Sequence, residues 1–369
     1  MTMEFCVPCL FGLEGLAADE LRYLGMDDVR TETGRVLFEG DERALVKANL
    51  WLRTGERVYV LLGEFPAPTF DALFEGTKAL PWESLIDYHA AFPVKGSSLD
   101  SALKSIPDCQ RIVKKAVAER LGQKYRAERL PETGNPCQIR FSLMKDRASL
   151  YLDASGPSLH KRGWRADSGE APLRETLAAA MVKLSRFKGR ETFLDPFCGS
   201  GTIAIEAALA ARNLAPGLGR RFAAEGWKSI PEKLWAEERA EAREKQYRGD
   251  YRIFASDVDP KVLETAKENA RTAGVAEDIV FSQADARKLT LPEEKGILIT
   301  NPPYGDRLME PREAEALVRS IGKSWRLNRD WRLYILSADL DFEKNFGRRA
   351  AKRRKLYNGM IQCQLYMYF

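Results

Sequence analysis

The chain has 369 residues, of which 44% are hydrophobic and 10% aromatic, enough apolar surface to fill the cores of about two or three domains. The 58 Lys and Arg against 53 Asp and Glu give a formal net charge of +5, which excludes a histone-like polycation. Two histidines, His89 and His160, are too few for a three-histidine zinc site and make a Ser-His-Asp hydrolase a poor match, so we expect no metal site.

The N-terminus and the cysteines indicate a protein of a reducing compartment. Residues 1–10 lack the basic region, hydrophobic stretch and cleavage site of a signal peptide, and no uncharged apolar run reaches eighteen residues. We therefore expect a cytoplasmic protein that does not contact a membrane. The six cysteines are too few for a secreted disulfide framework, and the CxxC pair Cys6 and Cys9 has no second pair with which to hold a metal. We expect both of these cysteines to be structural.

Residues 1–65 predict a small split β-α-β sandwich. Short apolar runs expected to be strands alternate with two amphipathic stretches, and Leu13, Leu16, Ala17, Leu21 and Leu24 place one apolar face on the first helix. The strands are expected at 4–9, 35–40 and 57–65, and the helices at 13–24 and 41–52. The proline-containing stretch 64–70 then marks a boundary.

Residues 66–155 predict a second α+β unit, with one strongly basic helix. The expected helices are 71–80 and 109–121, and the expected strands are 88–94, 137–144 and 147–153. The second helix region has one acid, Glu119, against five basic residues: Arg111, Lys114, Lys115, Arg120 and Lys124. This pattern suits either a solvated helix face or a surface for a phosphate backbone, for which Lys114 and Lys115 are the candidates.

Residues 156–171 are rich in Gly, Ser and basic residues and predict a charged linker. From residue 172 to 369, helical patterns alternate five times with short apolar strands, which indicates an α/β domain with a doubly wound, Rossmann-like parallel sheet. The expected strands are 192–195, 252–257, 278–285, 296–300 and 331–337, and the helices include 201–211, 232–248 and 260–273. Asn358-Gly359 then predicts a type I′ hairpin, so the sheet should end in an antiparallel pair.

A glycine-rich turn follows the first strand of this domain, in the sequence DPFCGSGT from Asp195 to Thr202. Glycines allow a tight turn and a close backbone approach, and free N–H groups at a helix start favour an anion. Gly199, Gly201 and Ala204 also satisfy the dinucleotide pattern GxGxxG/A, so an NAD oxidoreductase must be weighed. A P-loop is excluded because no Gly-Lys-Ser/Thr follows.

Two acids follow the next two strands. Asp257, in SDVDP, stands where a carboxylate can accept both ribose hydroxyls of a nucleotide cofactor. In NAD enzymes that acid comes about 20 residues after the glycines, and here the long charged segment 212–252 intervenes, which weakens the NAD interpretation. Asp285, in ADA, could accept from the exocyclic amine of adenine. Either acid could instead be a helix N-cap.

The sequence TNPPYG directly follows the fourth strand, 296–300. Pro302 and Pro303 fix two φ angles and lack N–H donors, so the carbonyls of this turn stay unpaired and point outward. The amide oxygen of Asn301 and the carbonyl of Pro302 can then accept the two hydrogens of an amino group, while Tyr304 stacks on the base. An ordinary Asn-Pro turn is the alternative. Its position after the fourth strand, in line with the other three motifs, favours the functional interpretation.

Together these motifs resemble class I S-adenosylmethionine-dependent methyltransferases that act on exocyclic amines of nucleobases. The segments SLHKRGWR, APLRETLAAA and NLAPGLGRRFAAEGW resemble the THUMP-containing RNA guanine-N2 methyltransferases, in particular the group that modifies the large-subunit ribosomal RNA (23S), in a form without a second, fused methyltransferase. The resemblance covers essentially the whole chain. It implies a ferredoxin-like domain at 1–65, a THUMP domain that holds structured RNA at 66–155, the basic linker at 156–171 and the methyltransferase domain at 172–369.

The resemblance also implies roles for individual residues. The methionine part of S-adenosylmethionine, which leaves as S-adenosylhomocysteine, is expected at Asp195, Cys198, Gly199, Ser200, Gly201 and Thr202. Asp257 is expected to bind its ribose and Asp285 its adenine amine, with Phe197, Val258, Ala286 and Asn301 also in the cofactor site. The target base is expected at Asn301, Pro302, Pro303 and Tyr304. Cys198 occupies a variable position, and we interpret it as a small spacer without a nucleophilic role.

Basic residues outside the motifs are candidates for RNA contacts. In the linker, Lys161, Arg162 and Arg165 flank Trp164, which could stack on a base. Near the C-terminus, six charges precede the hairpin: Arg348, Arg349, Lys352, Arg353, Arg354 and Lys355. A solvated charge run is the alternative for both groups. Beside a nucleobase site, phosphate contact becomes the better interpretation.

Guanine N2 is a weak nucleophile and a sulfonium methyl is highly activated, so the enzyme mainly has to hold the two in line, and no strong base is required. We therefore expect guanine-N2 methylation of RNA. The competing hypotheses are a transfer RNA substrate, adenine-N6 methylation, a non-catalytic RNA-binding assembly factor and the NAD oxidoreductase, which leaves Asn-Pro-Pro-Tyr without a purpose.

Overall fold

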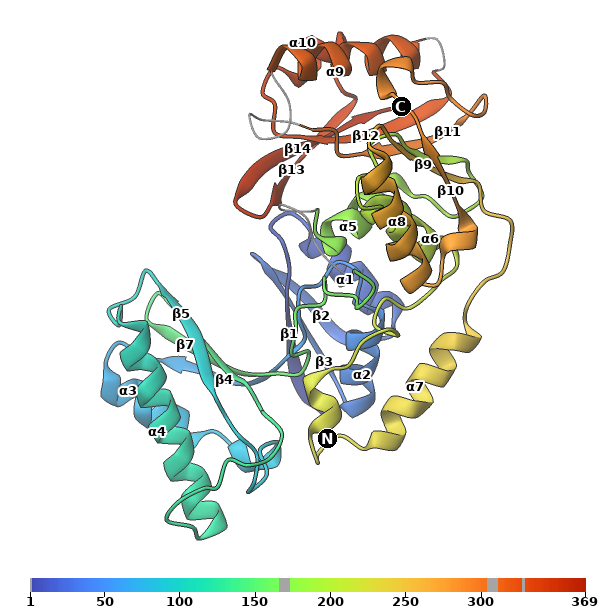
Figure 1. Cartoon of the computed structure of the whole chain (residues 1–369). Coiled ribbons are helices and arrows are strands. Elements are labelled where there is room, and N and C mark those ends of the chain that lie inside the picture. Colours follow the sequence, from blue (N-terminus) through green and yellow to red (C-terminus); the bar gives the residue numbers. More distant parts are fainter. Residues whose placement is uncertain (1, 166–172, 304–310, 327–328) are drawn as a thin grey trace. The chain divides into compact units, whose positions relative to one another are not determined.

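The computed structural model describes residues 2–165, 173–303, 311–326 and 329–369, and the chain forms two compact units (Figure 1). Unit 1 contains Met1–Cys9, Ala17–Leu159 and Arg221–Glu241, and unit 2 contains Leu10–Leu16, His160–Arg220 and Ala242–Phe369. Each unit therefore includes a short segment that chain order alone would assign to the other. Within the described ranges, no helix is both long and apolar enough to cross a membrane.

Unit 1 is built on a seven-stranded sheet with the order β2-β3-β1-β4-β7-β6-β5. Its strands are β1 (Met3–Pro8), β2 (Asp27–Glu32), β3 (Arg35–Gly40), β4 (Tyr59–Pro66), β5 (Val94–Leu99), β6 (Ile139–Met144) and β7 (Arg147–Asp153). Its helices are α1 (Glu14–Tyr23), α2 (Glu42–Trp51), α3 (Phe70–Ala79) and α4 (Ile106–Tyr125), with the 3-10 turns η1 (Trp82–Ser84) and η2 (Ala223–Gly226).

The first part of unit 1 confirms the predicted split β-α-β sandwich. β1 pairs antiparallel with both β3 and β4, and the rings of Phe5 and Phe38 stack at 4.8 Å beneath the helices. Asp41 starts α2 as a helix cap, since its side chain accepts from Ala44 N at 2.9 Å. β2 escaped the sequence analysis because it is an exposed, polar edge strand without an apolar alternation.

β4 joins the two predicted halves of unit 1 in one sheet. It pairs with β1 through Tyr59–Leu61 and with β7 along Tyr59–Pro66. The proline-containing stretch after Phe65 is therefore a boundary in the chain but does not interrupt the sheet.

The strand predicted at 88–94 is wrong. The strand in this region is β5, Val94–Leu99, which pairs parallel with β6 from Val94 onward. Before it, only the isolated bridge Ala91↔Pro136 forms. Pro93 has no N–H to donate, so the continuous ladder begins after it.

Unit 2 contains the second sheet, with the order β10-β9-β8-β11-β12-β14-β13. Its strands are β8 (Phe193–Asp195), β9 (Ile253–Asp257), β10 (Ile279–Gln283), β11 (Gly296–Thr300), β12 (Trp331–Ser337), β13 (Lys352–Asn358) and β14 (Ile361–Tyr368). Its helices are α5 (Glu175–Ser185), α6 (Thr202–Ala211), α8 (Pro260–Thr272), α9 (Pro311–Arg326) and α10 (Phe342–Phe346), with η3 (Ala276–Asp278) and η4 (Ala286–Lys288). The charged helix α7 (Glu232–Glu244) ends four residues before its predicted end at 248 and begins in unit 1.

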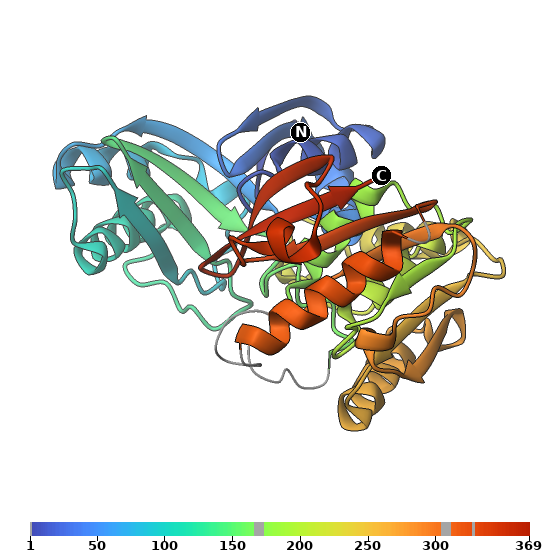
Figure 2. The ribbon, with the colours of Figure 1, turned by 90° about the horizontal axis from the view of Figure 1, so that it is seen from above.

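This sheet confirms the predicted doubly wound architecture. β10, β9, β8, β11 and β12 are parallel, and β14 and β13 are antiparallel. One face packs on α5, α6 and α8 through a cluster that includes Leu177 and Ile205, and the other packs on α9 and α10 through a cluster that includes Trp325 and Phe342 (Figure 2). The strand order reverses between β8 and β11, and ligands bind at such a switch point.

The C-terminal hairpin has a different turn from the predicted one. Asn358 pairs with Ile361, so the two loop residues are Gly359 and Met360. Gly359 has φ +62°, and Met360 is not among the positive-φ residues. Glycine with positive φ at the first loop position is the requirement of a type II′ turn, so the type I′ prediction is wrong by one residue of register.

Candidate active site

The four sequence motifs meet at one edge of the second sheet. Asp195 ends β8, Asp257 ends β9, Asp285 follows β10 and Asn301 follows β11. Because these strands are parallel and adjacent, their carboxyl ends lie on the same side, next to the switch point between β8 and β11. The sheet thus places side by side motifs that lie up to about 100 residues apart in the chain.

The glycine-rich turn depends on its two glycines. Gly199 has φ +52° and Gly201 has φ +86°, and Gly201 is the N-cap of α6. A Cβ at Gly199 would have no neighbour within 4 Å, whereas one at Gly201 would lie 3.2 Å from the Cβ of Ala266. Gly199 therefore lines an open face, and Gly201 lets α6 pack closely on α8.

Asp257 ties the glycine turn to β9. Its Oδ2 accepts from Gly199 N at 3.0 Å and its Oδ1 accepts from Asp259 N at 3.1 Å. Each carboxylate oxygen keeps a second lone pair, as a ribose ligand requires. Beside it, Val258 is 61% exposed, an uncommon state for valine that leaves an apolar surface next to Asp257.

Asp195 is fully buried at the end of β8. Its Oδ1 accepts from Thr300 Oγ1 at 2.7 Å and from Phe197 N at 3.2 Å, while Oδ2 has no hydrogen-bond partner within the described ranges. Desolvation by burial raises the pKa of this carboxyl from 3.8 to about 7. A buried, half-satisfied carboxyl is a group that a cationic ligand would stabilise.

Asn301 and Pro302 continue β11 beyond its last residue, Thr300. The Oδ1 of Asn301 is buried and has no hydrogen-bond partner in the described part of the chain, and Pro302 is buried. An amide oxygen in this state costs free energy unless a donor reaches it. Tyr304 lies outside the described residues, so its predicted stacking role stays a prediction.

Asp285, which was expected to accept from the adenine amine, already has hydrogen-bond partners within the protein. It caps η4 by accepting from Arg287 N at 2.9 Å, and both carboxylate oxygens also contact the Arg287 guanidinium. These hydrogen bonds lower the pKa of the Asp285 carboxyl. Ala286, next to it, is buried. The helix-cap alternative is therefore realised at Asp285, and binding of an adenine amine would have to share the carboxylate with Arg287.

Family models match almost the whole chain. The RMKL-like methyltransferase domain matches residues 162–367, the RlmL ferredoxin-like domain matches residues 4–59, and the THUMP domain matches residues 67–153. The chain belongs to the RMKL-like methyltransferase family.

The chain matches nearly the full length of one relative of this methyltransferase and only half the length of another. It is 46% identical to the "Putative RNA methyltransferase YpsC" of Bacillus subtilis, over 97% of this chain and 94% of that protein. It is 37% identical to the "Ribosomal RNA large subunit methyltransferase K/L" of Psychromonas ingrahamii, over 99% of this chain and 50% of that protein. The chain thus spans about half the length of the K/L relative.

Solved structures share the full fold. A protein of Listeria monocytogenes described as a "predicted N6-adenine-specific DNA methylase" is 42% identical with a TM-score of 0.95, covering 100% of this chain and 96% of that one. SMU.472, a "putative methyltransferase complexed with SAH", is 40% identical with a TM-score of 0.95, covering 100% and 98%.

The RMKL-like methyltransferase has the fold of S-adenosylmethionine-dependent enzymes, and its residues fit that cofactor. The unpartnered Oδ2 of Asp195 suits the methionyl ammonium, the open backbone at Gly199 suits the methionyl part, and Asp257 suits the ribose. Burial raises the pKa of the Cys198 thiol, which suits the predicted spacer and not a thiolate nucleophile. Cys6 and Cys9 are likewise buried, and desolvation raises the pKa of Cys6 to about 12.

Two of the linker residues predicted to contact RNA, Arg162 and Trp164, are buried in the structure. Arg162 is buried and forms an ion pair with buried Glu206, Nε to Oε1 at 3.1 Å. Trp164 is 4% exposed within the unit 2 core, so its ring is not available for stacking on a base. Lys161 remains a candidate. The predictions for Arg162 and Trp164 are wrong because local basic composition does not reveal which side chains the fold buries.

Arg165 contacts the glycine turn instead of the surface. Its guanidinium donates to Thr202 Oγ1 at 2.8 Å and to Ser200 Oγ at 3.4 Å, and it pairs with Glu175 at 2.9 Å. Asn269 also reaches this turn, donating from Nδ2 to Ser200 O at 3.0 Å. The sequence analysis missed both contacts, since no local pattern connects these positions to the turn.

The remaining basic candidates stay at the surface. Lys114 pairs with Glu132 and lies 3.5 Å from the centroid of Phe92, while Lys115 is exposed on α4. Arg348 and Arg349 are exposed, Arg353 pairs with Glu343, and Arg354 donates from Nε to Gly12 O at 3.1 Å.

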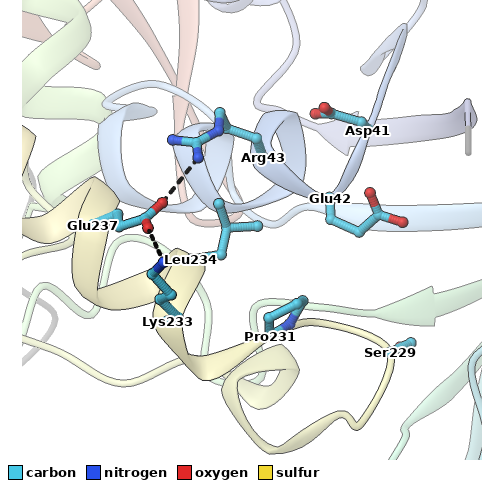
Figure 3. Close-up of a pocket in the computed structure, with 8 residues that line it drawn as sticks. All are labelled: Asp41, Glu42, Arg43, Ser229, Pro231, Lys233, Leu234 and Glu237. Atoms are coloured by element: carbon cyan, nitrogen blue, oxygen red, sulfur yellow. Dashed lines mark hydrogen bonds and ion pairs between the residues drawn. The ribbon is translucent and has the colours of Figure 1, made fainter.

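A separate surface pocket lies in unit 1, between α2 and the segment 229–237 (Figure 3). It has a volume of about 380 Å³, and Arg43 pairs there with Glu237 at 3.0 Å while Lys233 approaches the same carboxylate at 3.5 Å. Both of its basic side chains, Arg43 and Lys233, pair with Glu237, and none of the predicted site residues lines it.

Proposed function

We propose that this methyltransferase transfers a methyl group from S-adenosylmethionine to the exocyclic N2 amine of a guanine in RNA, with large-subunit ribosomal RNA as the substrate. The observation that carries the proposal is the buried Oδ1 of Asn301, which has no hydrogen-bond partner among the described residues. Asn301 directly follows β11 and therefore lies beside the glycine turn of β8. The names of the YpsC and K/L relatives and the THUMP match at 67–153 support RNA as the substrate.

The chain's part in the reaction is positioning. Asn301 Oδ1 and the Pro302 carbonyl would accept the two amine hydrogens, which aims the nitrogen lone pair out of this corner. Asp195 and Asp257 would fix the donor on the other side of the switch point. When bound, the donor supplies an activated methyl group. The described site offers orientation without a strong base, which suits in-line transfer to a weak nucleophile.

Methylation of large-subunit RNA with labelled donor, followed by digestion to nucleosides, tests the proposal. We expect label in N2-methylguanosine. Label in N6-methyladenosine would instead favour adenine-N6 methylation, the activity named for the Listeria structure. Label in transfer RNA alone would mean that the substrate is transfer RNA and not ribosomal RNA. No label in any RNA from a donor-binding protein would refute the proposed function.

The variant Asn301→Ala tests the corner itself. Loss of the acceptor should lower the transfer rate by at least about 100-fold and leave donor affinity within about twofold, because the main role of the amide is to orient the base. Asn135→Ala is a matched control, an exposed asparagine of unit 1 that donates to Gly226 O. Wild-type turnover by Asn301→Ala on native RNA would refute the assignment.

A further inference from the structure

The β13–β14 hairpin extends past the sheet edge that carries the active site. The last β11–β12 pair is Thr300↔Ile335 and the last β12–β14 pair is Ser337↔Gln364. The first three residues of β14, Ile361–Cys363, therefore continue about 10 Å beyond β12. Only β12 lies between β14 and β11, so strand spacings put Ile361, the first residue of β14, roughly 17 Å from Asn301.

The two faces of the projecting hairpin differ in chemistry. Leu356 and Cys363 form a cross-strand pair that is buried in the unit 2 core. The opposite face carries the pairs Lys355↔Gln364 and Tyr357↔Gln362, with Lys355 and Gln362 exposed. This second face thus combines a cation, an aromatic ring and two amides, and it contains no acid between 355 and 364.

Phe11 adds a second ring to this face. Its centroid lies 6.3 Å from that of Tyr357 at 67°, and Lys355 Nζ lies 5.5 Å from the Tyr357 centroid. Arg354 fixes the Phe11 segment by donating to the carbonyl of Gly12, and 10–16 belongs to unit 2. Phe11 is nevertheless 57% exposed, and Met360 at the tip is 98% exposed. We call Phe11, Lys355, Tyr357, Met360 and Gln362 the hairpin platform.

We propose that the hairpin platform binds an unpaired nucleotide of the RNA strand close to the methylated one. Because the Phe11 and Tyr357 rings lie at 67° to each other, the base would stack on one ring and contact the edge of the other. Lys355 would contact its phosphate, and the Gln362 amide could hydrogen-bond to the edge of the base. The exposed cation Lys355, the exposed ring of Phe11 beside the half-buried ring of Tyr357, and a position at the active-site edge together favour a nucleic acid strand over an apolar protein partner. The inference rests on the proposed function and specifies how the RNA approaches the site.

The double variant Phe11→Ala/Tyr357→Ala tests the platform. We expect the KM for large-subunit RNA to rise about 5- to 100-fold, the loss associated with one stacked base, with kcat and donor affinity unchanged. Tyr247→Ala is the matched control, because Tyr247 is an exposed aromatic residue of unit 2, 57% exposed like Phe11. Tyr357→Phe in the presence of Phe11 should retain wild-type KM because it keeps the ring.

Binding of a single-stranded RNA 12-mer gives a readout independent of methylation. The double variant should bind it more weakly, and Lys355→Gln should reduce the salt slope of binding by about 0.7. The platform would be overturned if the wild-type protein methylates RNA but the double variant keeps the wild-type KM and 12-mer affinity and Lys355→Gln keeps the wild-type salt slope. A wild-type protein that methylates no RNA would instead overturn the proposed function, so the two failures are distinguishable.

Discussion

The buried carboxyl of Asp195 should make donor binding depend on pH. In the protein without donor, desolvation raises its pKa to about 7, well above the 3.8 of an exposed aspartate. A methionyl ammonium next to the unpartnered Oδ2 would favour the ionised carboxylate. Below about pH 7, donor binding must therefore release a proton, and donor affinity should rise with pH and level off above 7.

The size of this effect follows from the pKa. If the carboxyl is fully ionised in the complex, donor affinity should rise about eightfold between about pH 5.5 and 6.5, with close to one proton released at pH 6. The α-amino group of the donor titrates near 7.7–8.0 and so keeps its charge in this window. Calorimetric titration in two buffers of different ionisation enthalpy measures both the affinity and the proton release.

The same linkage affects stability with a defined sign. Between about pH 4 and 7 the folded protein keeps a proton that the unfolded chain has released, so the stabilising contribution of protonated Asp195 falls as pH rises through 7. Asp195→Asn keeps an acceptor for Thr300 Oγ1 but cannot titrate, so it should remove the pH dependence of donor binding. A wild-type affinity that is flat over the window, or an Asn variant with the same slope, would refute the reasoning.

Three further outcomes are expected. Arg162→Ala should cost about 3–5 kcal/mol of unfolding free energy in a urea titration, because it leaves the buried carboxylate of Glu206 without this partner; a loss below about 1 kcal/mol would contradict a buried pair. Trp164→Phe should leave RNA affinity in filter binding unchanged, since the ring is buried, and a tenfold loss would mean that it reaches the RNA. Reversing Arg348, Arg349 and Lys352 to Glu should lower the salt slope of RNA binding by about two, whereas an unchanged slope would make them ordinary surface charge.

The motifs were predictable because each one is local. A turn that needs positive φ can be recognised from its glycines, and the prolines Pro302 and Pro303 restrict φ wherever they occur. Asp257 and Asn301 could be placed at strand ends because apolar runs of about five residues precede them, and parallel strands end at one edge. The hairpin was also visible as a turn dipeptide, but its register depends on cross-strand pairing, which shifted the loop to Gly359 and Met360.

The sequence by itself determined the family, the doubly wound sheet and the order of its motifs, since these depend on patterns within short stretches of chain. Only the tertiary structure decided that Arg165 contacts the glycine turn while Arg162 and Trp164 are buried, because neighbours in a basic stretch take different directions once the chain folds. It also decided that 10–16 joins unit 2 and 221–241 joins unit 1. Burial and partners depend on contacts between distant segments, which no local pattern records.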